Sequence, residues 1–255
     1  MGKRGQVTIY VIIAIVVVAL IVLIFMFKPE VESFFGSNLD PNAFLNDRLK
    51  TPLTEEKEFL SKQGGYIEPE GFILYKGNKI KYLCYNYKYY LPCKVQQPMI
   101  KQKFEEELAK SMESDVKNSI IELKSQLERR GYEISGGNNI KISTEMAPNK
   151  VKLIIDSELK TKKGEETKTY EKFEIELNSE MYFLLMTATS IVDFESAYGD
   201  SETRLYLLYY PNLVIEKNKL GDGSKIYKLK EITTNEEFYF ASRSVAWPGG
   251  LGLTA

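Results

Sequence analysis

The stretch PMIKQKFEEELAKSMESDVKNSIIELKSQLERRG, residues 98–131, decides the fold of this chain. It predicts one amphipathic helix, because apolar side chains recur at helical spacing along it. Pro98 and Gly131 mark the two ends of that helix. Successive apolar residues are mostly four positions apart, so the apolar stripe drifts around the helix. A regular two-stranded coiled coil is therefore disfavoured, and we expect the helix to lie across a sheet. The stripe consists of Ile100, Phe104, Leu108, Met112, Val116, Ile120, Leu123 and Leu127.

Strands for that sheet follow directly. Apolar and polar residues alternate in YEIS, NIKISTEM, KVKLIIDSEL and KTYEKFEIELN, which is typical of strands with one buried face. A turn at Pro148-Asn149 and a polar hairpin loop at 160–169 connect them. Three inward rows are expected: Ile140, Ile142 and Thr144; Val151, Leu153 and Ile155; Phe173, Ile175 and Leu177.

A second helix is predicted over residues 179–199, capped by Ser179. It is apolar almost all round, which predicts deep burial. Four more strands are expected after it, in RLYLLYYP, LVIEKNK, KIYKLKE and EEFYFASRSVAW. Because helices and antiparallel strands segregate along the chain, the fold class is α+β rather than a parallel βαβ sheet.

Upstream of the long helix, residues 72–95 are predicted to form a three-stranded meander. Its strands hold the only two cysteines, Cys84 and Cys93. Outside a cell, a close pair of this kind indicates a disulfide, here stapling a hairpin near its base. The alternative is two unpaired buried thiols.

The same segment is rich in tyrosine, and it is the best candidate binding surface in the sequence. Tyrosine suits interfaces, where it stacks on sugars or packs on a protein partner. The simpler interpretation is cross-strand aromatic pairing within a small sheet. The residues concerned are Tyr82, Tyr85, Tyr87, Tyr89 and Tyr90.

An uncharged apolar run of 21 residues, VTIYVIIAIVVVALIVLIFMF, occupies residues 7–27. As a helix it reaches about 31 Å, close to the ~30 Å hydrocarbon core of a bilayer. We predict a single transmembrane helix, with Lys3 and Arg4 holding the N-terminus in the cytoplasm and the C-terminal part outside. A cleaved secretory signal is the alternative, but no small-x-small site follows the run.

The chain is expected to divide into four parts. Pro, Gly, Asn and Asp interrupt any period after the apolar run, which predicts a stalk that ends in a short helix before Gly64-Gly65. The parts are residues 1–28, the cytoplasmic tip and transmembrane helix; 29–65, the stalk and short helix; 66–247, an extracytoplasmic α+β domain; and 248–255, a mobile tail.

Lys3-Arg4-Gly5-Gln6 resembles the class III signal peptide of archaeal type IV pilin-like proteins. The resemblance implies a processing site between Gly5 and Gln6, cut by a prepilin peptidase. Tyr10 departs from the family pattern, which has a Glu there to neutralise the N-terminus of the neighbouring subunit in a filament.

Further motifs are spread along the rest of the chain: Tyr82-x-Cys84, Tyr89-Tyr90-x-Pro92-Cys93, Gln96-Gln97-Pro98 and Arg129-Arg130-Gly131-Tyr132. With these motifs the chain resembles an uncharacterised family of membrane-anchored surface proteins from small-genome archaea. This resemblance implies a location and a lineage, and no activity.

Composition narrows the function classes. The chain has no His, which removes the commonest general base and zinc ligand and excludes Ser-His-Asp and Cys-His nucleophilic schemes. Charge is nearly balanced, with 34 Lys and Arg against 35 Asp and Glu and no basic stripe, so no nucleic-acid partner is expected. We expect no catalytic residues, no metal and no cofactor.

One acidic group tests that expectation: Asp193, Glu195, Asp200 and Glu202 at the end of the second helix. Such a group could be the carboxylate pair of a hydrolase or a calcium site. The favoured interpretation is the polar end of a helix, since calcium-loop spacing is missing.

The sequence therefore predicts a single-pass membrane protein with an extracellular α+β domain and no catalysis. Its expected role is structural or adhesive at the cell surface, with pilin-like assembly included. Its expected partners are the lipid bilayer and either other copies of itself or envelope proteins. The alternatives are a membrane-tethered accessory subunit of an envelope complex and a carboxylate-dependent hydrolase.

Overall fold

The structure is a computed structural model that describes residues 15–18 and 39–247. The expected membrane helix falls outside the described residues except for 15–18, which are helical. The Gly5-Gln6 site, the first part of the expected stalk and the tail 248–255 also fall outside them. Within the described part of the chain, no helix has both the length and the apolar character needed to cross a membrane.

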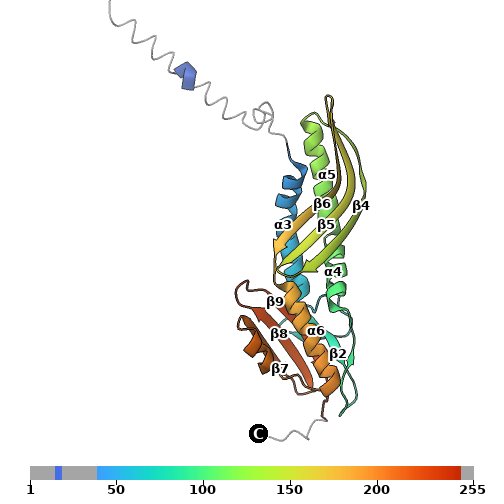
Figure 1. Ribbon diagram of the computed structural model, residues 1–255, viewed down its shortest axis with the longest axis vertical. Coiled ribbons are helices and arrows are strands. Elements are labelled where there is room, and N and C mark those ends of the chain that lie inside the picture. Colours follow the sequence, from blue (N-terminus) through green and yellow to red (C-terminus); the bar gives the residue numbers. More distant parts are fainter. Residues whose placement is uncertain (1–14, 19–38, 248–255) are drawn as a thin grey trace, which may run out of the picture.

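The described fold is mixed α+β, with two sheets whose strands are mostly antiparallel (Figure 1). One sheet has the order β4-β5-β6, and the other has the order β1-β2-β9-β8-β7 with β3 paired to β2. The elements are α3 (Pro41–Ser61), β1 (Phe72–Tyr75), β2 (Asn78–Tyr85), β3 (Lys94–Val95), α4 (Ile100–Ser111), α5 (Glu113–Arg129), β4 (Glu133–Ala147), β5 (Lys150–Lys163), β6 (Glu166–Asn178), α6 (Met181–Tyr198), α7 (Arg204–Tyr209), β7 (Leu213–Lys219), β8 (Ser224–Glu231) and β9 (Glu237–Arg243).

The three-stranded sheet has the register that the alternation predicted. Ile142 pairs with Ile155, which pairs in turn with Phe173, so the inward rows lie side by side. The expected polar loop at 160–169 is wrong in extent, because β5 and β6 continue to a tight turn after Lys163. Ladder hydrogen bonds persist there, although both faces of the hairpin are mostly solvated.

The apolar stripe of the long helix is confirmed, and all eight of its side chains are buried. The helix is divided into α4 and α5 by a turn at Met112. Its hydrogen bonding is nearly continuous, since the Val116 amide still donates to the Met112 carbonyl at 3.0 Å. We attribute the break to the drift of a four-residue spacing, which a small change of direction at Met112 corrects so that both halves face the twisted β4 strand.

The expected stalk is wrong from residue 41 onward, because residues 41–50 belong to the single helix α3. Asp40 caps this helix by accepting a hydrogen bond from the Asn42 amide at 3.1 Å, and Pro41 stands at its first position. The folded part therefore begins well before residue 66. Burial against β6 and α5 outweighs the poor helix propensity of Asn, Asp and the internal Pro52. The buried leucines are Leu45, Leu49, Leu53 and Leu60.

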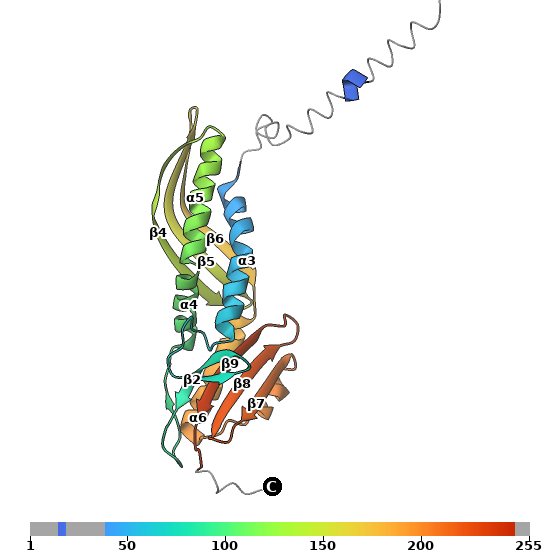
Figure 2. The same cartoon turned by 180° about the vertical axis from the view of Figure 1, so that it is seen from behind.

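Figure 2 shows α3 and the α4–α5 pair side by side over one face of the β4-β5-β6 sheet. The helix α6 packs on the second sheet, against β2, β8 and β9. The N-cap position is Glu180 rather than the predicted Ser179, although Ser179 Oγ accepts a hydrogen bond from the Met181 amide at 3.2 Å. One contiguous apolar core runs from the leucines of α3 to Phe240 on β9 and joins the two sheets.

The second sheet differs from the sequence prediction in three places. The third strand of the expected meander is reduced to Lys94–Val95. Residues 204–209 form the short helix α7 rather than a strand, and Tyr206 of this helix bonds Ser190 of α6 at 2.7 Å between hydroxyl oxygens. The backbone bonds of this segment close locally, and the Tyr210 amide donates to the Tyr206 carbonyl at 2.9 Å. In addition, β2 pairs in parallel with β9, which joins the meander to the end of the chain.

The molecule is elongated (Figure 1). The helix α3 begins beside the three-stranded sheet, and the hairpin that follows β2 lies at the opposite end of the long axis. The tyrosine-rich segment is consequently displayed at the end far from the start of α3.

Candidate binding surface

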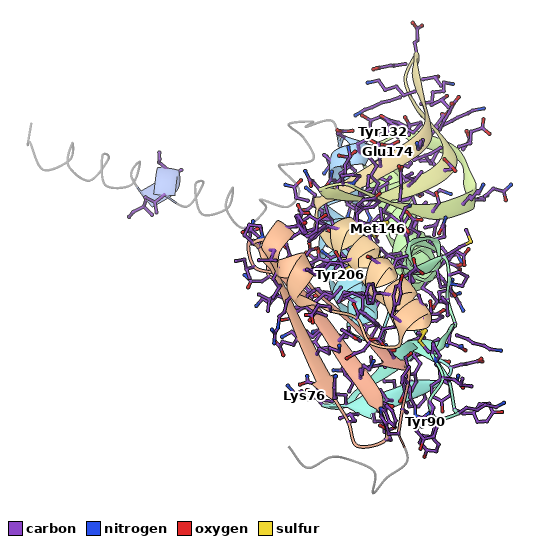
Figure 3. The ribbon with its side chains drawn as sticks, turned by 60° about the horizontal axis from the view of Figure 1, so that its bottom comes forward. Lys76, Tyr90, Tyr132, Met146, Glu174 and Tyr206 are labelled. Atoms are coloured by element: carbon purple, nitrogen blue, oxygen red, sulfur yellow. A yellow bond between two sulfur atoms is a disulfide. The ribbon has the colours of Figure 1, made fainter. Side chains whose placement is uncertain are left out.

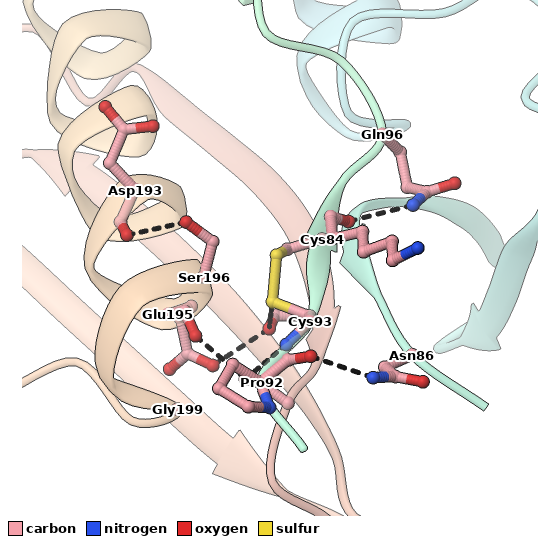
Figure 4. The surroundings of a disulfide bond; sticks show 12 residues. Cys84, Asn86, Pro92, Cys93, Gln96, Asp193, Glu195, Ser196 and Gly199 are labelled. Carbon is pink, nitrogen blue, oxygen red and sulfur yellow. Dashed lines mark hydrogen bonds between the residues drawn. A yellow bond between two sulfur atoms is a disulfide. The ribbon is translucent and has the colours of Figure 1, made fainter. Parts of the chain in front are cut away.

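Cys84 and Cys93 form a disulfide, with their Cα atoms 5.4 Å apart (Figure 4). Both cysteines are buried, and Cys84 pairs with Val95 across β2 and β3. The bond therefore closes residues 85–92 into a loop at the base of a hairpin, as the spacing predicted.

Hydrogen bonds hold this loop against the chain that follows β9. The Asn86 amide donates to the Arg243 carbonyl, and the Tyr90 amide donates to the Ala246 carbonyl, both at 3.0 Å. The Val245 amide returns a bond of 3.0 Å to the Leu91 carbonyl. Residues 85–92 and 243–247 therefore form one ordered unit.

The side chains of that unit present aromatic rings to solvent. Tyr87 is 72% exposed and Trp247 is 59% exposed. Figure 3 shows Tyr90 at the edge of the molecule, pointing outward. We define the tyrosine surface as Tyr85, Tyr87, Tyr89, Tyr90, Leu91 and Trp247, all of which are exposed.

The structure sorts the predicted tyrosines into two groups. The rings of Tyr89 and Tyr90 lie 6.3 Å apart, and Trp247 meets Tyr90 edge-to-face at 5.1 Å. Tyr82 is half-buried and pairs instead with Tyr85, at 5.0 Å. The sequence analysis missed Trp247; its only signal was that it is the single tryptophan of the chain.

Arg243 fixes the geometry beneath the tyrosine surface. Its Nε donates to the Asp222 carbonyl at 2.9 Å, and its Nη1 donates to the Asn86 carbonyl. The guanidinium carbon lies 5.2 Å from the centre of the Tyr89 ring, a cation–π contact. The planar fork of an arginine can serve all three partners at once.

Behind the disulfide, Glu195 is fully buried and bonded on both carboxylate oxygens. Lys225 Nζ donates to it at 2.7 Å and Ser242 Oγ at 2.9 Å, and the Tyr227 hydroxyl donates as well. Burial, reinforced by the charge of Glu195, raises the pKa of Tyr227 far above its ordinary value. The tyrosine therefore stays protonated and acts as a donor.

This buried network reaches the disulfide through a serine. Ser244 Oγ donates to the Glu195 carbonyl at 2.8 Å and accepts from the Cys93 amide at 2.9 Å. The end of α6, the strand β9 and the disulfide loop are thus connected by hydrogen bonds between buried groups, which are strong in a low-dielectric interior.

Asp200 lies at the outer edge of this network. It forms ion pairs with Lys217, Lys219 and Lys225. Partial burial alone would raise the pKa of the Asp200 carboxyl, but hydrogen bonds from the three lysines outweigh it and hold that pKa well below its ordinary value.

The predicted acidic group is only partly brought together. Glu195 and Asp200 share Lys225, whereas Asp193 and Glu202 lie exposed. Within residues 15–18 and 39–247, no three His, Cys, Asp or Glu side chains are grouped so as to hold a metal ion. The contacts of Glu195 attach the end of α6 to the second sheet.

In comparisons with known proteins, no family model matches the chain, and no curated protein or solved structure matches it either.

Proposed function

We propose that this chain is a membrane-anchored, non-enzymatic surface protein that binds through the tyrosine surface. The apolar run at residues 7–27 would hold it in the bilayer, and the basic residues before that run would place residues 39–247 outside the cell. A disulfide within the described domain is consistent with an oxidising compartment.

The observation that carries the proposal is the exposure of a preorganised aromatic surface at one end of the molecule. Exposed aromatic side chains that cluster on an ordered scaffold are typical of binding sites, since rigid rings lose little entropy on binding. The position of this surface, opposite the start of α3, suits contact with something beyond the membrane.

A membrane-tethered accessory subunit of an envelope complex is the second candidate. It would use the same surface, but for one protein partner at fixed stoichiometry. The edge-to-face contact of Tyr90 with Trp247 favours neither candidate, because either kind of partner can pack on it.

The test uses the full-length chain in fluorescent proteoliposomes, applied to envelopes of the organism that encodes it. We expect Tyr87→Ser, Tyr90→Ser and Trp247→Ser together to reduce retention at least tenfold. A matched control carries Ile121→Ser, Leu208→Ser and Tyr209→Ser, which alter exposed side chains on the helices α5 and α7. Equal retention of the two triple variants would refute the proposal.

Native purification after crosslinking separates the candidates. A single stoichiometric protein partner that depends on the tyrosine surface would establish the accessory subunit. Filaments in sheared surface material would establish a pilin-like structural role.

A further inference from the structure

A surface pocket of about 440 Å³ opens beside the tyrosine surface, between the β1–β2 hairpin and the turn before β8. Its volume lies within the range of small-molecule sites in proteins. The lining comes from three separate parts of the chain: Gly71, Phe72, Lys81, Tyr82, Tyr85, Gln96 and Asp222.

Three aromatic side chains are among those that line this pocket. Phe72 begins β1 and pairs in register with Lys81 on β2, so its ring lies on the same face of the hairpin as Lys81, and Tyr82 lies on the opposite face. Tyr82 and Tyr85 contact each other edge-to-face, with ring centres 5.0 Å apart and planes at 63°. Phe72 and Tyr85 are exposed and can cover the apolar face of a ligand.

Hydrogen-bonding side chains also line the pocket. Asp222 is held in place by Ser224, which donates to its carboxylate from the backbone at 2.9 Å and from the hydroxyl at 2.8 Å. The same Ser224 hydroxyl bonds the Tyr82 hydroxyl at 2.8 Å. These hydrogen bonds connect Asp222 to Tyr82 through Ser224, so the two lining side chains are preorganised.

Gln96 and Lys81 complete the polar lining. The Gln96 side chain donates to the Lys94 carbonyl at 2.8 Å, which uses one of its two amide donors. Lys81 donates to the Glu70 carbonyl and lies 5.1 Å from the centre of the Tyr66 ring. Burial lowers the pKa of Lys81, because it disfavours the charged ammonium, and burial also raises the pKa of Tyr82.

The charge of the lining selects against ionic ligands. Among the lining residues that the structure describes, Lys81 and Asp222 are the ionisable side chains besides the tyrosines, and they carry opposite charges. A phosphate or a nucleotide would need a surplus of positive charge, and a cationic ligand would need a surplus of negative charge. A balanced lining favours a neutral ligand with many hydroxyl groups.

We propose that this pocket binds a neutral saccharide. Sugar rings combine an apolar face of C–H groups with a rim of hydroxyls, and the pocket is lined both by aromatic rings and by amide, ammonium and carboxylate groups. The inference deepens the proposed surface-binding function and rests on it, because Tyr85 belongs both to the pocket and to the tyrosine surface. A longer glycan would run from the pocket over Tyr87 and Tyr90.

The experiment probes the full-length chain, solubilised in a detergent without a sugar headgroup. The probe is an array of neutral hexose and N-acetylhexosamine oligosaccharides that includes neutral glycans released from envelopes of the encoding organism. Titration calorimetry then measures the affinity of the strongest hit. We expect Phe72→Ala to weaken that affinity about tenfold through the lost ring contact and Gln96→Ala about fivefold through the lost hydrogen bond.

Phe72→Tyr keeps the ring and should bind within about twofold of the unmodified chain. Tyr198→Ala removes an exposed tyrosine elsewhere and should have no effect. The saccharide proposal is overturned if no neutral glycan binds, if only anionic glycans bind, or if Phe72→Ala and Gln96→Ala bind as tightly as the unmodified chain.

The two proposals can fail separately. If proteoliposomes are retained on envelopes through the tyrosine surface while no saccharide binds, the pocket proposal falls and the surface function stands. If saccharides bind in the pocket while retention does not depend on the tyrosine surface, the surface function falls and the pocket stands.

Discussion

At the scale of single residues, Glu195 joins the end of α6 to the second sheet through buried hydrogen bonds. Replacing it with Gln should destabilise the fold by about 3 kcal/mol, because Lys225 and Tyr227 would lose a buried charged acceptor. For a domain of this size, the melting temperature should fall by about 6–12 °C in a thermal melt followed by circular dichroism. Asp193→Asn, on the exposed face of the same helix, is the control and should change stability by less than about 0.5 kcal/mol. Equal melting temperatures for the two variants would contradict this role.

Asp200 makes part of the stability depend on pH. Its pKa in the fold lies below the ordinary value of 3.8, so its ion pairs stabilise the protein above about pH 4. That stabilisation is lost as pH falls toward the depressed pKa and the carboxylate gains a proton. Denaturant titrations between pH 7 and pH 2 should show the deficit of Asp200→Asn shrinking below about pH 4. A deficit that stays constant down to pH 2 would rule out this linkage.

At the scale of elements, two adjacent isoleucines on α5 test how the long helix is held. Ile120 is buried against the sheet, whereas Ile121 is 66% exposed. Ile120→Ala should cost about 2–5 kcal/mol in unfolding free energy, since it removes buried apolar surface and leaves a cavity. Ile121→Ala makes the same chemical change and should cost less than about 0.5 kcal/mol, measured by denaturant unfolding. The packing described for α5 is wrong if the two costs are the same.

The disulfide loop is the second element with a measurable contribution. Closing a loop of about ten residues should stabilise the fold by about 2.5–3 kcal/mol in the chain-entropy model, so Cys84→Ala with Cys93→Ala should lose about that much. Mass spectrometry of the unfolded chain should show a gain of two hydrogens on reduction. The double variant, treated identically, is the control and should show none. An unchanged mass for the unmodified chain would exclude the bond.

At the scale of the whole molecule, the proposed anchor has a simple topological consequence. An epitope tag after Ala255 should be reached by antibody on intact cells, whereas a tag placed inside the first six residues should be reached only after permeabilisation. The reason is that short basic ends remain in the cytoplasm while long segments are translocated. Labelling with the opposite pattern would reverse the proposed orientation.

How well the structure could be predicted from the sequence differs from one element to the next. The stripe of α4 and α5 and the three inward rows of the β4-β5-β6 sheet follow from local periodicity, and the structure confirms them. The strand expected at residues 204–211 is wrong, because the pattern of a short apolar segment does not distinguish a strand from a helix. The helix α3 was missed over residues 41–50 because Asn, Asp and Pro obscured Leu45 and Leu49, whose burial only packing reveals.

The candidate site shows the same division. The clustering of the tyrosines and the two cysteines can be seen in the sequence. Which of these side chains are exposed and which are buried cannot. The parallel pairing of β2 with β9 brings Trp247 to Tyr90 and Arg243 to Tyr89, and these residues are more than 150 positions apart. The burial of Glu195 beside Lys225 likewise depends on where α6 docks.

By itself the sequence determined the α+β class, the amphipathic helix, the register of one sheet and the pair of cysteines, because each depends on residue spacing along a chain of fixed geometry. Only the tertiary structure decided the parallel β2–β9 pairing, the buried network of Glu195 and the composition of the aromatic surface. Those features join segments distant in the sequence, and their free energy comes from burial and from hydrogen bonds that exist only once both segments are in place.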